Sequence, residues 1–360
     1  QLEHIHHYGQ PFAVTEYSQQ RYVHDINAAY AAIAGTQKNI ALAVDNVEHV
    51  DPLINLFDTF LGGEGKFMER PFVEIGGCPI VAPLRFGKDN AEVDVRMAEL
   101  GLTIGVSPST QAVRTAPASL AGTLVQAFAE TLACLCVVNL INPGSYCDFE
   151  MWPFVSDLRT GAFTGGSGEQ AVLMAACGQM GRYYDLPTGI AAGMADSKLP
   201  DAQSGYEKGY TNVLAGHSGA NLIYESAGMH ASLLGCCLES YVIDNDMLGA
   251  INRTIRGIEV NEDTLSLEAM REVCLDGPSH YLGHDQTMAL MLRDYVYPDL
   301  GDRNSPKDWN EAGRPDLVEQ ARYRVKQILS AARPQHIPAD VDSQIRERFP
   351  VKLPLEAMGG

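Results

Sequence analysis

Short apolar runs alternate with longer segments whose apolar residues recur at helical spacing through most of this chain. The short runs predict strands, and the longer segments, rich in Ala, Leu, Met, Glu and Gln, predict helices. Strands are predicted at 39–45, 79–86, 102–108, 145–152, 188–194, 220–226 and 240–244, and helices at 46–61, 88–100, 117–141, 168–184, 201–215, 228–237 and 245–256. Strands separated by helices indicate βαβ units and a parallel sheet.

The number of predicted strands bears on the architecture of this α/β protein. Seven candidates, with room for an eighth, fit a (β/α)8 TIM barrel better than an open doubly wound sheet. No glycine-rich dinucleotide fingerprint follows the first strand, which also disfavours a Rossmann fold. We predict a single domain over 1–360, with the barrel at about 36–290 and a more charged helical extension at about 291–360. Because the chain starts at Gln1 without Met, we expect an upstream segment to be missing.

Composition narrows the possible classes of function. Hydrophobic residues make up 46% and charged residues 20% of the 360 residues, which is ordinary for a globular protein with a sizeable core. The formal net charge of −19 argues against a nucleic-acid-binding protein, which needs clustered Lys and Arg. An acidic chain is compatible with a cationic ligand, although most acidic proteins are simply soluble.

Cysteine usage and the longest apolar segment bear on location. The eight cysteines form no CxxC pair and lie mostly in apolar runs, which favours reduced, buried thiols over disulfides or metal sites. The segment 120–141 is long enough to cross a membrane, but Gln126 and Glu130 lie near its middle, so a buried helix of a soluble protein is preferred. No signal peptide is visible. We predict a cytoplasmic protein without a membrane partner.

In a TIM barrel, functional side chains lie at the carboxyl ends of the strands. The segment 146–154, YCDFEMWPF, ends one predicted strand, and alternation places Asp148, Glu150 and Trp152 on one face. Carboxylates beside an aromatic ring could form a cage for an ammonium group, or the aromatic residues could simply be core. Another strand end, LIYESAGMH, offers Tyr224, Glu225 and His230, with a surface glutamate as the plainer interpretation of Glu225.

Two further motifs have a structural and a functional interpretation. In the glycine-rich loop FTGGSGEQ, Ser167 and Gln170 have capping-box spacing, and a plain helix cap is preferred over an anion site. His280 and His284 have the i,i+4 spacing that can bind zinc on a helix. The intervening glycine and the lack of a glutamate after the first histidine exclude an HExxH site and favour a loop or capping role.

Several motifs occur together and in order between about residue 80 and residue 290. They are RTAPASLAGTLVQAFAETLA (114–133), NPGSYCDF (142–149), DLRTGAFTGGSGE (157–169), GMADSKLPDAQSGYEK (193–208), ESYVIDNDMLGAINRTIRGIEV (239–260) and GPSHYLGHDQT (277–287). The chain resembles the trimethylamine methyltransferase superfamily, whose members are corrinoid-dependent enzymes with a TIM-barrel fold. The trimethylamine enzymes themselves carry pyrrolysine, which this sequence lacks. The resemblance therefore points to the branch that demethylates quaternary amines such as glycine betaine, proline betaine and carnitine.

The resemblance implies transfer of a methyl group to the Co(I) of a separate corrinoid protein, so we expect neither a side-chain nucleophile nor a bound metal. We expect Asp148, Glu150, Trp152 and Tyr224 to line the ammonium end of the substrate. The remaining candidates for substrate binding are Arg159, Lys198, Gln203 and His230, which would hold a carboxylate or meet the corrinoid protein, together with Asp196, which could instead orient Lys198, and Glu225. The partners are then the corrinoid protein and a small quaternary amine, and we expect a homo-oligomer.

Three alternatives stay open on sequence alone. The first is a related methyltransferase for another substrate, and the second is a barrel that binds betaines without demethylating them. The third is a zinc-dependent methyltransferase, for which Cys236, Cys237, His280 and His284 are the available ligands.

Overall fold

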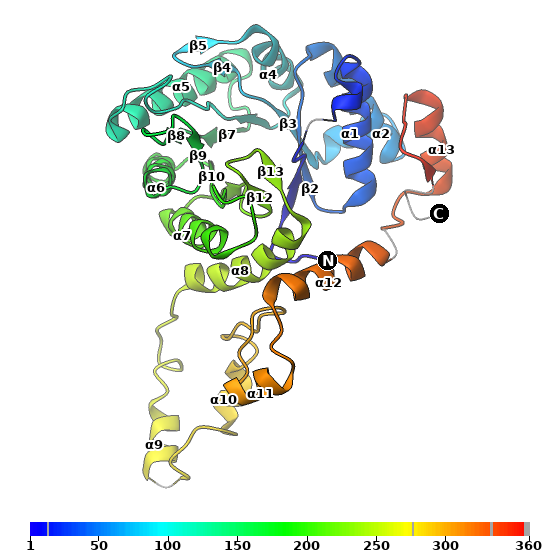
Figure 1. The fold of residues 1–360 in the computed structure, drawn as a ribbon. Coiled ribbons are helices and arrows are strands. Elements are labelled where there is room, and N and C mark those ends of the chain that lie inside the picture. Colours follow the sequence, from blue (N-terminus) through cyan, green and yellow to red (C-terminus); the bar gives the residue numbers. More distant parts are fainter. Residues whose placement is uncertain (13, 276, 332–333, 356–360) are drawn as a thin grey trace.

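The computed structural model describes residues 1–12, 14–275, 277–331 and 334–355, and it has a mixed α/β body from which a C-terminal arm projects (Figure 1). Parallel strands in the body form two sheets. One sheet has the order β1 (His7–Gly9), β2 (Asn39–Ala43), β3 (Val73–Gly76), and the other has the order β11 (Leu222–Tyr224), β10 (Thr188–Ala191), β7 (Cys147–Glu150), β6 (Ile104–Val106). A parallel bridge between Gly77 and Val106 connects the edge strands β3 and β6.

Helices surround the strands of the body (Figure 1). They are α1 (Arg21–Gly35), α2 (Val50–Phe60), α3 (Lys66–Glu69), α4 (Lys88–Leu100), α5 (Leu120–Ile141), α6 (Gly168–Tyr183), α7 (Ala202–Ser218) and α8 (Leu238–Arg256), with 3-10 turns η1 (Thr15–Tyr17) and η2 (Val47–His49). The outward-facing residues of the strands and the inner faces of the helices form the apolar core. Ile75 and Met97 belong to one buried cluster, and Phe149, Ile190 and Met174 to another. Burial of these side chains supplies the main stabilising free energy of the body.

Three antiparallel hairpins follow the strand ends. They are β4 (Ile80–Val81) with β5 (Arg85–Phe86), β8 (Val155–Ser156) with β9 (Phe163–Thr164), and β12 (Met229–His230) with β13 (Gly235–Cys236). Each hairpin comes between a strand of a parallel sheet and the helix that follows: the first lies between β3 and α4, the second between β7 and α6, and the third between β11 and α8. The hairpins therefore lengthen the loops at the carboxyl ends of the strands, where α/β proteins bind ligands.

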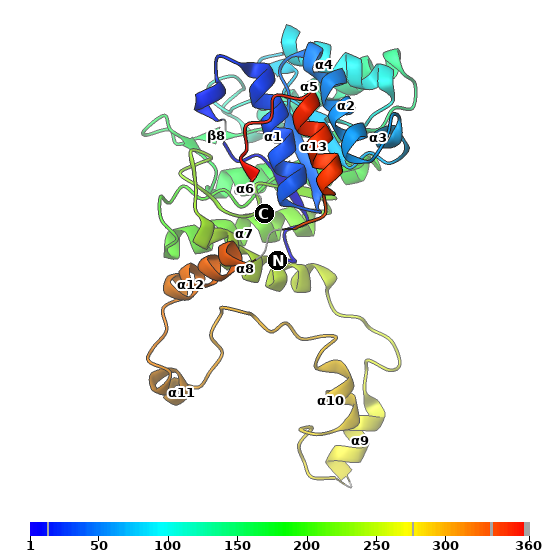
Figure 2. The same cartoon turned by 90° about the vertical axis from the view of Figure 1, so that its right-hand side faces the viewer.

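The segment after α8 leaves the body and returns to it, as Figures 1 and 2 show from two directions. Its helices are α9 (Leu267–Leu275), α10 (Asp285–Leu290), α11 (Pro306–Glu311), α12 (Leu317–Ser330) and α13 (Ala339–Arg348). The return is fixed by the Asp246 carboxylate on α8, which accepts hydrogen bonds from the backbone N–H groups of Leu300 and Gly301 at 2.9 Å. Ala321 of α12 packs against Val242, and Ile345 of α13 joins the core beside α2.

Most of the predicted strands and helices are confirmed within a few residues, but three predicted elements are wrong. The run 79–86 forms the β4–β5 hairpin, and Pro83 at its turn cannot donate to a strand ladder. The run 240–244 lies inside α8, so Asp244 and Asp246 are residues of a helix interior. The predicted helix 228–237 is the β12–β13 hairpin.

The hairpin conformation of 228–237 has a tertiary cause. Ala231, Ser232 and Leu233 all have positive φ angles of 49°, 53° and 74°, which excludes a right-handed helix there. The backbone N–H of Ala231 donates to Ser197 O, and that of Ser232 donates to Ala195 O, both at 2.9 Å. These hydrogen bonds to the loop that follows β10 offset the free-energy cost of the left-handed conformation. The sequence analysis also missed β1, α1 and β3.

Candidate functional site

Three carboxyl side chains converge between the two sheets. Glu74 comes from β3, and Asp148 and Glu150 come from β7, on the shared face that strand alternation predicts. One carboxylate oxygen from each residue lies within 4.8 Å of the others. Tyr224, the last residue of β11, donates its hydroxyl proton to the Glu74 carboxylate, whose two oxygens both lie at 3.2 Å. The contact joins β11 and β3, which belong to different sheets.

Two strand glycines make room for these side chains. A Cβ atom on Gly105 would overlap the Glu74 carboxylate, and one on Gly189 would lie 2.9 Å from the Tyr224 ring and 3.0 Å from Glu150 Cγ. Real Cβ atoms do not approach heavy atoms so closely. The glycines are therefore required at these positions because large polar side chains occupy the space above them, and not because of an unusual backbone conformation.

Aromatic rings border the carboxyl groups. The Trp152 and Tyr224 ring centroids lie 4.9 Å apart with the planes inclined at 54°, and the His7 ring meets Tyr224 edge-on at 5.3 Å. Two buried polar atoms of this group, Trp152 Nε1 and Glu150 Oε1, have no hydrogen-bond partner among the described residues. We call Glu74, Asp148, Glu150, Trp152, Tyr224 and His7 the strand-end cluster.

Burial controls the electrostatics of the strand-end cluster. Loss of hydration, reinforced by the neighbouring Asp148 charge, raises the pKa of Glu74 to about 7, although the Tyr224 hydroxyl opposes the shift. Loss of hydration and the neighbouring Glu74 raise the pKa of Glu150 to about 8. Burial also raises the pKa of Asp148 and of Tyr224, and it lowers the pKa of His7. The shifts of the three carboxyl groups share one cause, a poorly hydrated group of like charges, which a bound cation would relieve.

Among the described residues, the carboxylates of Glu74, Asp148 and Glu150 also have the spacing that could hold a metal ion. Cys236, Cys237, His280 and His284, the ligands considered for zinc, form no such group within the described ranges. His284 has the capping role that its sequence context favours: Nδ1 accepts from the Gln286 N–H at 3.2 Å as α10 begins, and Nε2 lies 3.1 Å from Glu272.

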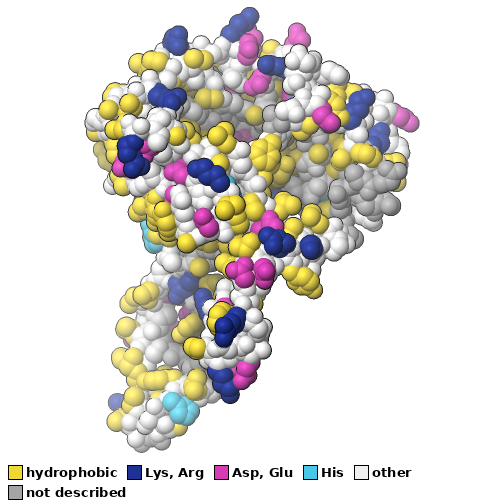
Figure 3. Space-filling model, in the orientation of Figure 1, with side chains coloured by type: hydrophobic (Ala, Val, Ile, Leu, Met, Phe, Trp, Pro, Cys, Tyr) yellow, Lys and Arg dark blue, Asp and Glu magenta, His cyan; other side chains and the backbone are white. Residues whose placement is uncertain are grey.

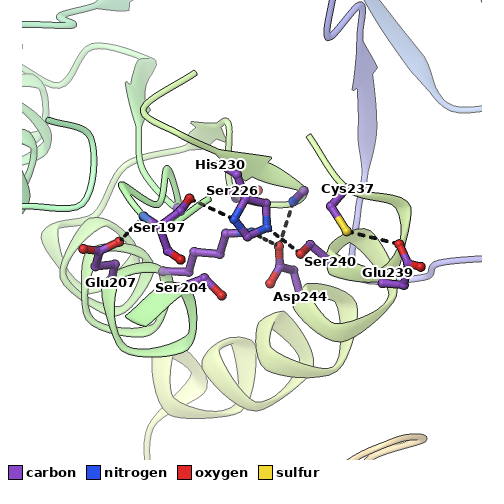
Figure 4. Close-up of polar contacts among 12 residues, drawn as sticks. Ser197, Ser204, Glu207, Ser226, His230, Cys237, Glu239, Ser240 and Asp244 are labelled. Atoms are coloured by element: carbon purple, nitrogen blue, oxygen red, sulfur yellow. Dashed lines mark hydrogen bonds and ion pairs between the residues drawn. The ribbon is translucent and has the colours of Figure 1, made fainter. Parts of the chain in front are cut away.

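The GMADSKLPDAQ segment forms a dense hydrogen-bond network beside α7, part of which Figure 4 shows. The Glu207 carboxylate accepts from the backbone N–H groups of Asp196 at 2.7 Å and Ser197 at 3.3 Å, while its other oxygen accepts from Gln203 at 2.8 Å. Asp196 accepts from the backbone N–H of Gly165 and from the Ser232 hydroxyl. Asp201 caps α7 through a capping box with Ser204. These contacts hold the loop in one conformation.

A buried ion pair continues this network into α8. Lys208 Nζ and Asp244 Oδ2 lie 2.6 Å apart with 1% and 5% of the side chains exposed, and the same oxygen accepts from Gly228 N–H at 2.7 Å. Burial raises the pKa of Asp244 even though both partners oppose the shift. His230 bridges Ser197 O at 3.2 Å and the Ser240 hydroxyl at 2.6 Å, and burial lowers its pKa (Figure 4).

The predicted site residues therefore fall into two groups. Asp148, Glu150, Trp152 and Tyr224 come together in the strand-end cluster. The other predicted residues lie elsewhere. Asp196, Gln203 and His230 belong to the hydrogen-bond network beside α7, and the exposed Lys198 donates to Asp196 O. Arg159 pairs with Asp157 in an exposed loop, and Glu225 is half-buried at a left-handed φ of 60°. In the described residues, no hydrogen bond or ion pair joins this second group to the strand-end carboxylates.

Sequence reasoning missed Glu74 and His7. The signal for Glu74 is the run FVEIGG at 72–77, a short alternating segment that ends in two glycines, with the glutamate on the face opposite Val73 and Ile75. Ser167 has the predicted capping role, because its hydroxyl accepts from the Gln170 N–H at 3.2 Å. A Cβ on Gly166 would lie 2.7 Å from the Glu207 carboxyl carbon, so this glycine allows the loop to approach α7.

Comparison with known proteins places the chain in a family. The family model described as trimethylamine methyltransferase (MTTB) matches residues 1–351. A protein named trimethylamine methyltransferase MttB from Methanosarcina thermophila is 30% identical over 343 residues, which are 94% of this chain and 69% of the relative. A glycine betaine methyltransferase from Desulfitobacterium hafniense strain Y51 is 27% identical over 325 residues, or 90% of this chain and 67% of the relative.

Among solved structures, a dihydropteroate synthase from Xanthomonas albilineans overlays 70% of this chain and 79% of its own with a TM-score of 0.37 and 11% identity. That score is too low to carry an argument about the fold.

Proposed function

The chain belongs to the trimethylamine methyltransferase family, and on that basis we propose that it moves a methyl group from a quaternary amine to the Co(I) of a corrinoid protein. The observation that carries the proposal to a site is the strand-end cluster, where three carboxyl groups within 4.8 Å adjoin two aromatic rings. Carboxylates and aromatic faces are the groups that bind methylated ammonium cations. The absence of pyrrolysine from the sequence supports a quaternary amine as the substrate.

The roles of the site residues follow from the needs of this reaction. The C–N bond breaks with its electron pair left on nitrogen, so the leaving group is a neutral tertiary amine that needs no proton. The carboxyl groups of Glu74, Asp148 and Glu150 hold the positive charge, and the rings of Trp152 and Tyr224 orient the methyl groups. We assign positioning and charge stabilisation to these residues and no covalent step.

The corrinoid, carried by a partner protein, supplies the nucleophilic metal that accepts the methyl group. The chain fits such a partner-borne group because Glu74, Asp148 and Trp152 are only partly buried and so can be reached from outside. The hairpins β4–β5, β8–β9 and β12–β13 lengthen the loops at that end of the sheets and offer surface for the partner.

We further propose that the two sheets close into a single (β/α)8-type barrel in one domain. Neighbouring strands follow chain order, β1-β2-β3 and β6-β7-β10-β11, without the reversal of order found in doubly wound sheets. The Gly77–Val106 bridge connects β3 to β6, and the His7–Tyr224 ring contact brings β1 close to β11. A cytoplasmic location is supported by the eight free cysteines, because disulfides are rare in that compartment.

The proposed function is tested with the reduced corrinoid protein and a panel of quaternary amines, with trimethylamine included. Methylation of the corrinoid is followed by its visible absorption, and loss of the amine is followed by chromatography. We expect at least one quaternary amine to be demethylated. Turnover of trimethylamine alone would refute the assignment to quaternary amines, and binding without turnover of any amine would favour a sensor instead of an enzyme.

A further inference from the structure

We propose that the strand-end cluster selects an ammonium cation whose other end carries no carboxylate, such as a choline-type alcohol or a plain tetraalkylammonium, in preference to a betaine. This inference rests on the proposed function, because it narrows the substrate of the same site. It follows from the charges that surround the ammonium position and from the contacts of the cationic side chains that the sequence suggests as carboxylate ligands.

The charge around the ammonium position is of one sign. Glu74, Asp148 and Glu150 lie within 4.8 Å of one another, and the pKa values of these residues are governed by burial, by each other and by Tyr224. No lysine or arginine of the described residues shifts the pKa of any of these three carboxyl groups. His7, the basic member of the cluster, has a lowered pKa, and its ring meets the Tyr224 ring edge-on. The counter-charge for this site must therefore come from the ligand.

The cationic side chains that the sequence suggests as carboxylate ligands, and the buried Lys208, have partners in other places. Lys198 Nζ donates to Asp196 O at 2.8 Å, and the Arg159 guanidinium pairs with Asp157 at 2.6 Å. Lys208 is buried against Asp244, and both ring nitrogens of His230 have partners. A betaine carboxylate bound close to its own ammonium would thus meet three acidic groups and no cation, and like charges at such separations cost several-fold to many-fold in affinity.

One neutral donor remains for the other end of the ligand. Trp152 Nε1 is buried and has no hydrogen-bond acceptor among the described residues. A hydroxyl or ether oxygen would accept this hydrogen bond without adding a negative charge. A buried indole N–H usually finds such a partner, and leaving it unpaired is costly. The cluster thus fits a molecule with a methylated ammonium head and an uncharged acceptor nearby.

The direct test compares choline with glycine betaine by isothermal titration calorimetry on the purified protein at pH 9, where the Glu74 and Glu150 carboxyl groups, whose pKa values are raised to about 7 and about 8, are ionised. Both ligands carry a trimethylammonium group on one methylene, and they differ in ending with a hydroxymethyl or a carboxylate. We expect choline to bind at least tenfold more tightly, and tetramethylammonium to bind more tightly than betaine. The uncharged isostere 3,3-dimethylbutanol should bind at least tenfold more weakly than choline. Equal or tighter binding of betaine would overturn the inference.

Variants locate the selectivity in the carboxyl groups. Glu74→Gln combined with Glu150→Gln should weaken choline binding at least tenfold and reduce the preference over betaine. Asp94→Asn is the matched control, because Asp94 is a buried carboxyl on α4 with a pKa raised by burial to about 8 that lies outside the cluster. An unchanged preference in the double variant would refute the assignment. The ligand comparison on the unmodified protein decides the question if that variant does not fold.

Binding and turnover separate this inference from the proposed function. If choline binds more tightly than betaine but no amine methylates the corrinoid, the proposed function fails and the ligand selectivity stands. If betaine is demethylated and binds at least as tightly as choline, the methyltransferase function stands and the selectivity for a carboxylate-free ammonium is wrong.

Discussion

At the scale of residues, the two buried glutamates of the strand-end cluster lower the stability of the folded protein when they are ionised. Burial raises the pKa of Glu74 to about 7 and of Glu150 to about 8, from 4.5. Between pH 5 and pH 8 the folded protein therefore binds more protons than the unfolded chain, and its stability falls as pH rises through this window. Asp148, Tyr224 and His7 face the same space, and none of them supplies a positive charge to reverse the trend.

This linkage gives a stability prediction for Glu150→Gln. At pH 9 the variant should be more stable than the unmodified protein by roughly 5 kcal/mol, the free energy that corresponds to the rise of the Glu150 pKa from 4.5 to about 8, whereas at pH 5 the two should differ by less than about 1 kcal/mol. Urea unfolding at pH 5, 7 and 9 measures the difference. A variant that is less stable at every pH would show that the Glu150 charge is already compensated within the fold.

A second residue-scale prediction concerns the buried pair Lys208–Asp244. Lys208→Met leaves a buried carboxylate with only the Gly228 N–H, so we expect a loss of about 3–5 kcal/mol in the free energy of unfolding. Adding Asp244→Asn should recover most of the loss, because the amide oxygen still accepts that N–H without a charge. Lys88→Met is the control: its partner Glu92 is 3.8 Å away and exposed, so its effect should stay below about 1 kcal/mol. Equal losses in both lysine variants would contradict the expected penalty.

At the scale of elements, the glycines of β6 and β10 decide whether the site exists. Gly105→Ala places a methyl group where the Glu74 carboxylate lies, while its strand backbone accepts alanine without strain. We expect the affinity for choline to fall at least tenfold, with a change in the free energy of unfolding of less than about 1 kcal/mol, since the flexible end of Glu74 can move. Calorimetry and urea unfolding measure the two quantities.

The matched control is Gly9→Ala, at the end of β1, where a Cβ would meet nothing within 4 Å. It should change neither quantity. If both alanine variants bind choline as tightly as the unmodified protein, the position of Glu74 is not set by Gly105, and the cluster tolerates rearrangement.

The elements also show what the sequence can predict about this site. Alternation along β7 places Asp148 and Glu150 on one face correctly, because that depends on neighbours in the chain. Glu74 was missed because β3 is a four-residue strand, and its meeting with Tyr224 depends on the pairing of distant strands. The β-branched run at 240–244 has strand propensity, but it lies within a nineteen-residue helix whose side chains Val242 and Leu248 are buried, and tertiary packing overrides local preference.

At the scale of the whole molecule, helix α5 exposes a large apolar surface. Among the described residues, α5 alone is long and apolar enough to cross a membrane, yet only 28% of its most apolar window is buried. Its inner face packs on the body through residues such as Thr131 and Val138, so the expected burial holds for that side alone. Outward-facing Val125 and Leu140 are 68% and 84% exposed. Next to it, Val172 and Tyr183 of α6 are exposed beside a groove of about 740 Å³ that α6 and α7 line.

We expect a second copy of the chain on this face in spite of the net charge of −19, because the face itself is uncharged. Two such chains repel each other over most of their surface, and they can approach only where charge is absent. The outward side of α5 meets that condition, since the residues exposed there are uncharged and Glu130, the acidic residue of this helix, is buried. The apolar residues exposed there are Ala121, Val125, Ala129, Cys136 and Leu140. We therefore expect self-association through α5, in line with the homo-oligomer that the sequence suggested.

Val125→Glu tests this assembly by placing a negative charge on each of the apposed faces. Leu158→Glu is the control, because Leu158 is 75% exposed and lies in the loop between β8 and β9, outside α5, while the added charge is the same. In sedimentation velocity across a range of concentrations, Val125→Glu should shift the protein to the monomer, with at least a tenfold weaker dimer, and Leu158→Glu should sediment as the unmodified protein does. A monomeric unmodified chain, or equal behaviour of both variants, would leave the apolar face of α5 to a different partner.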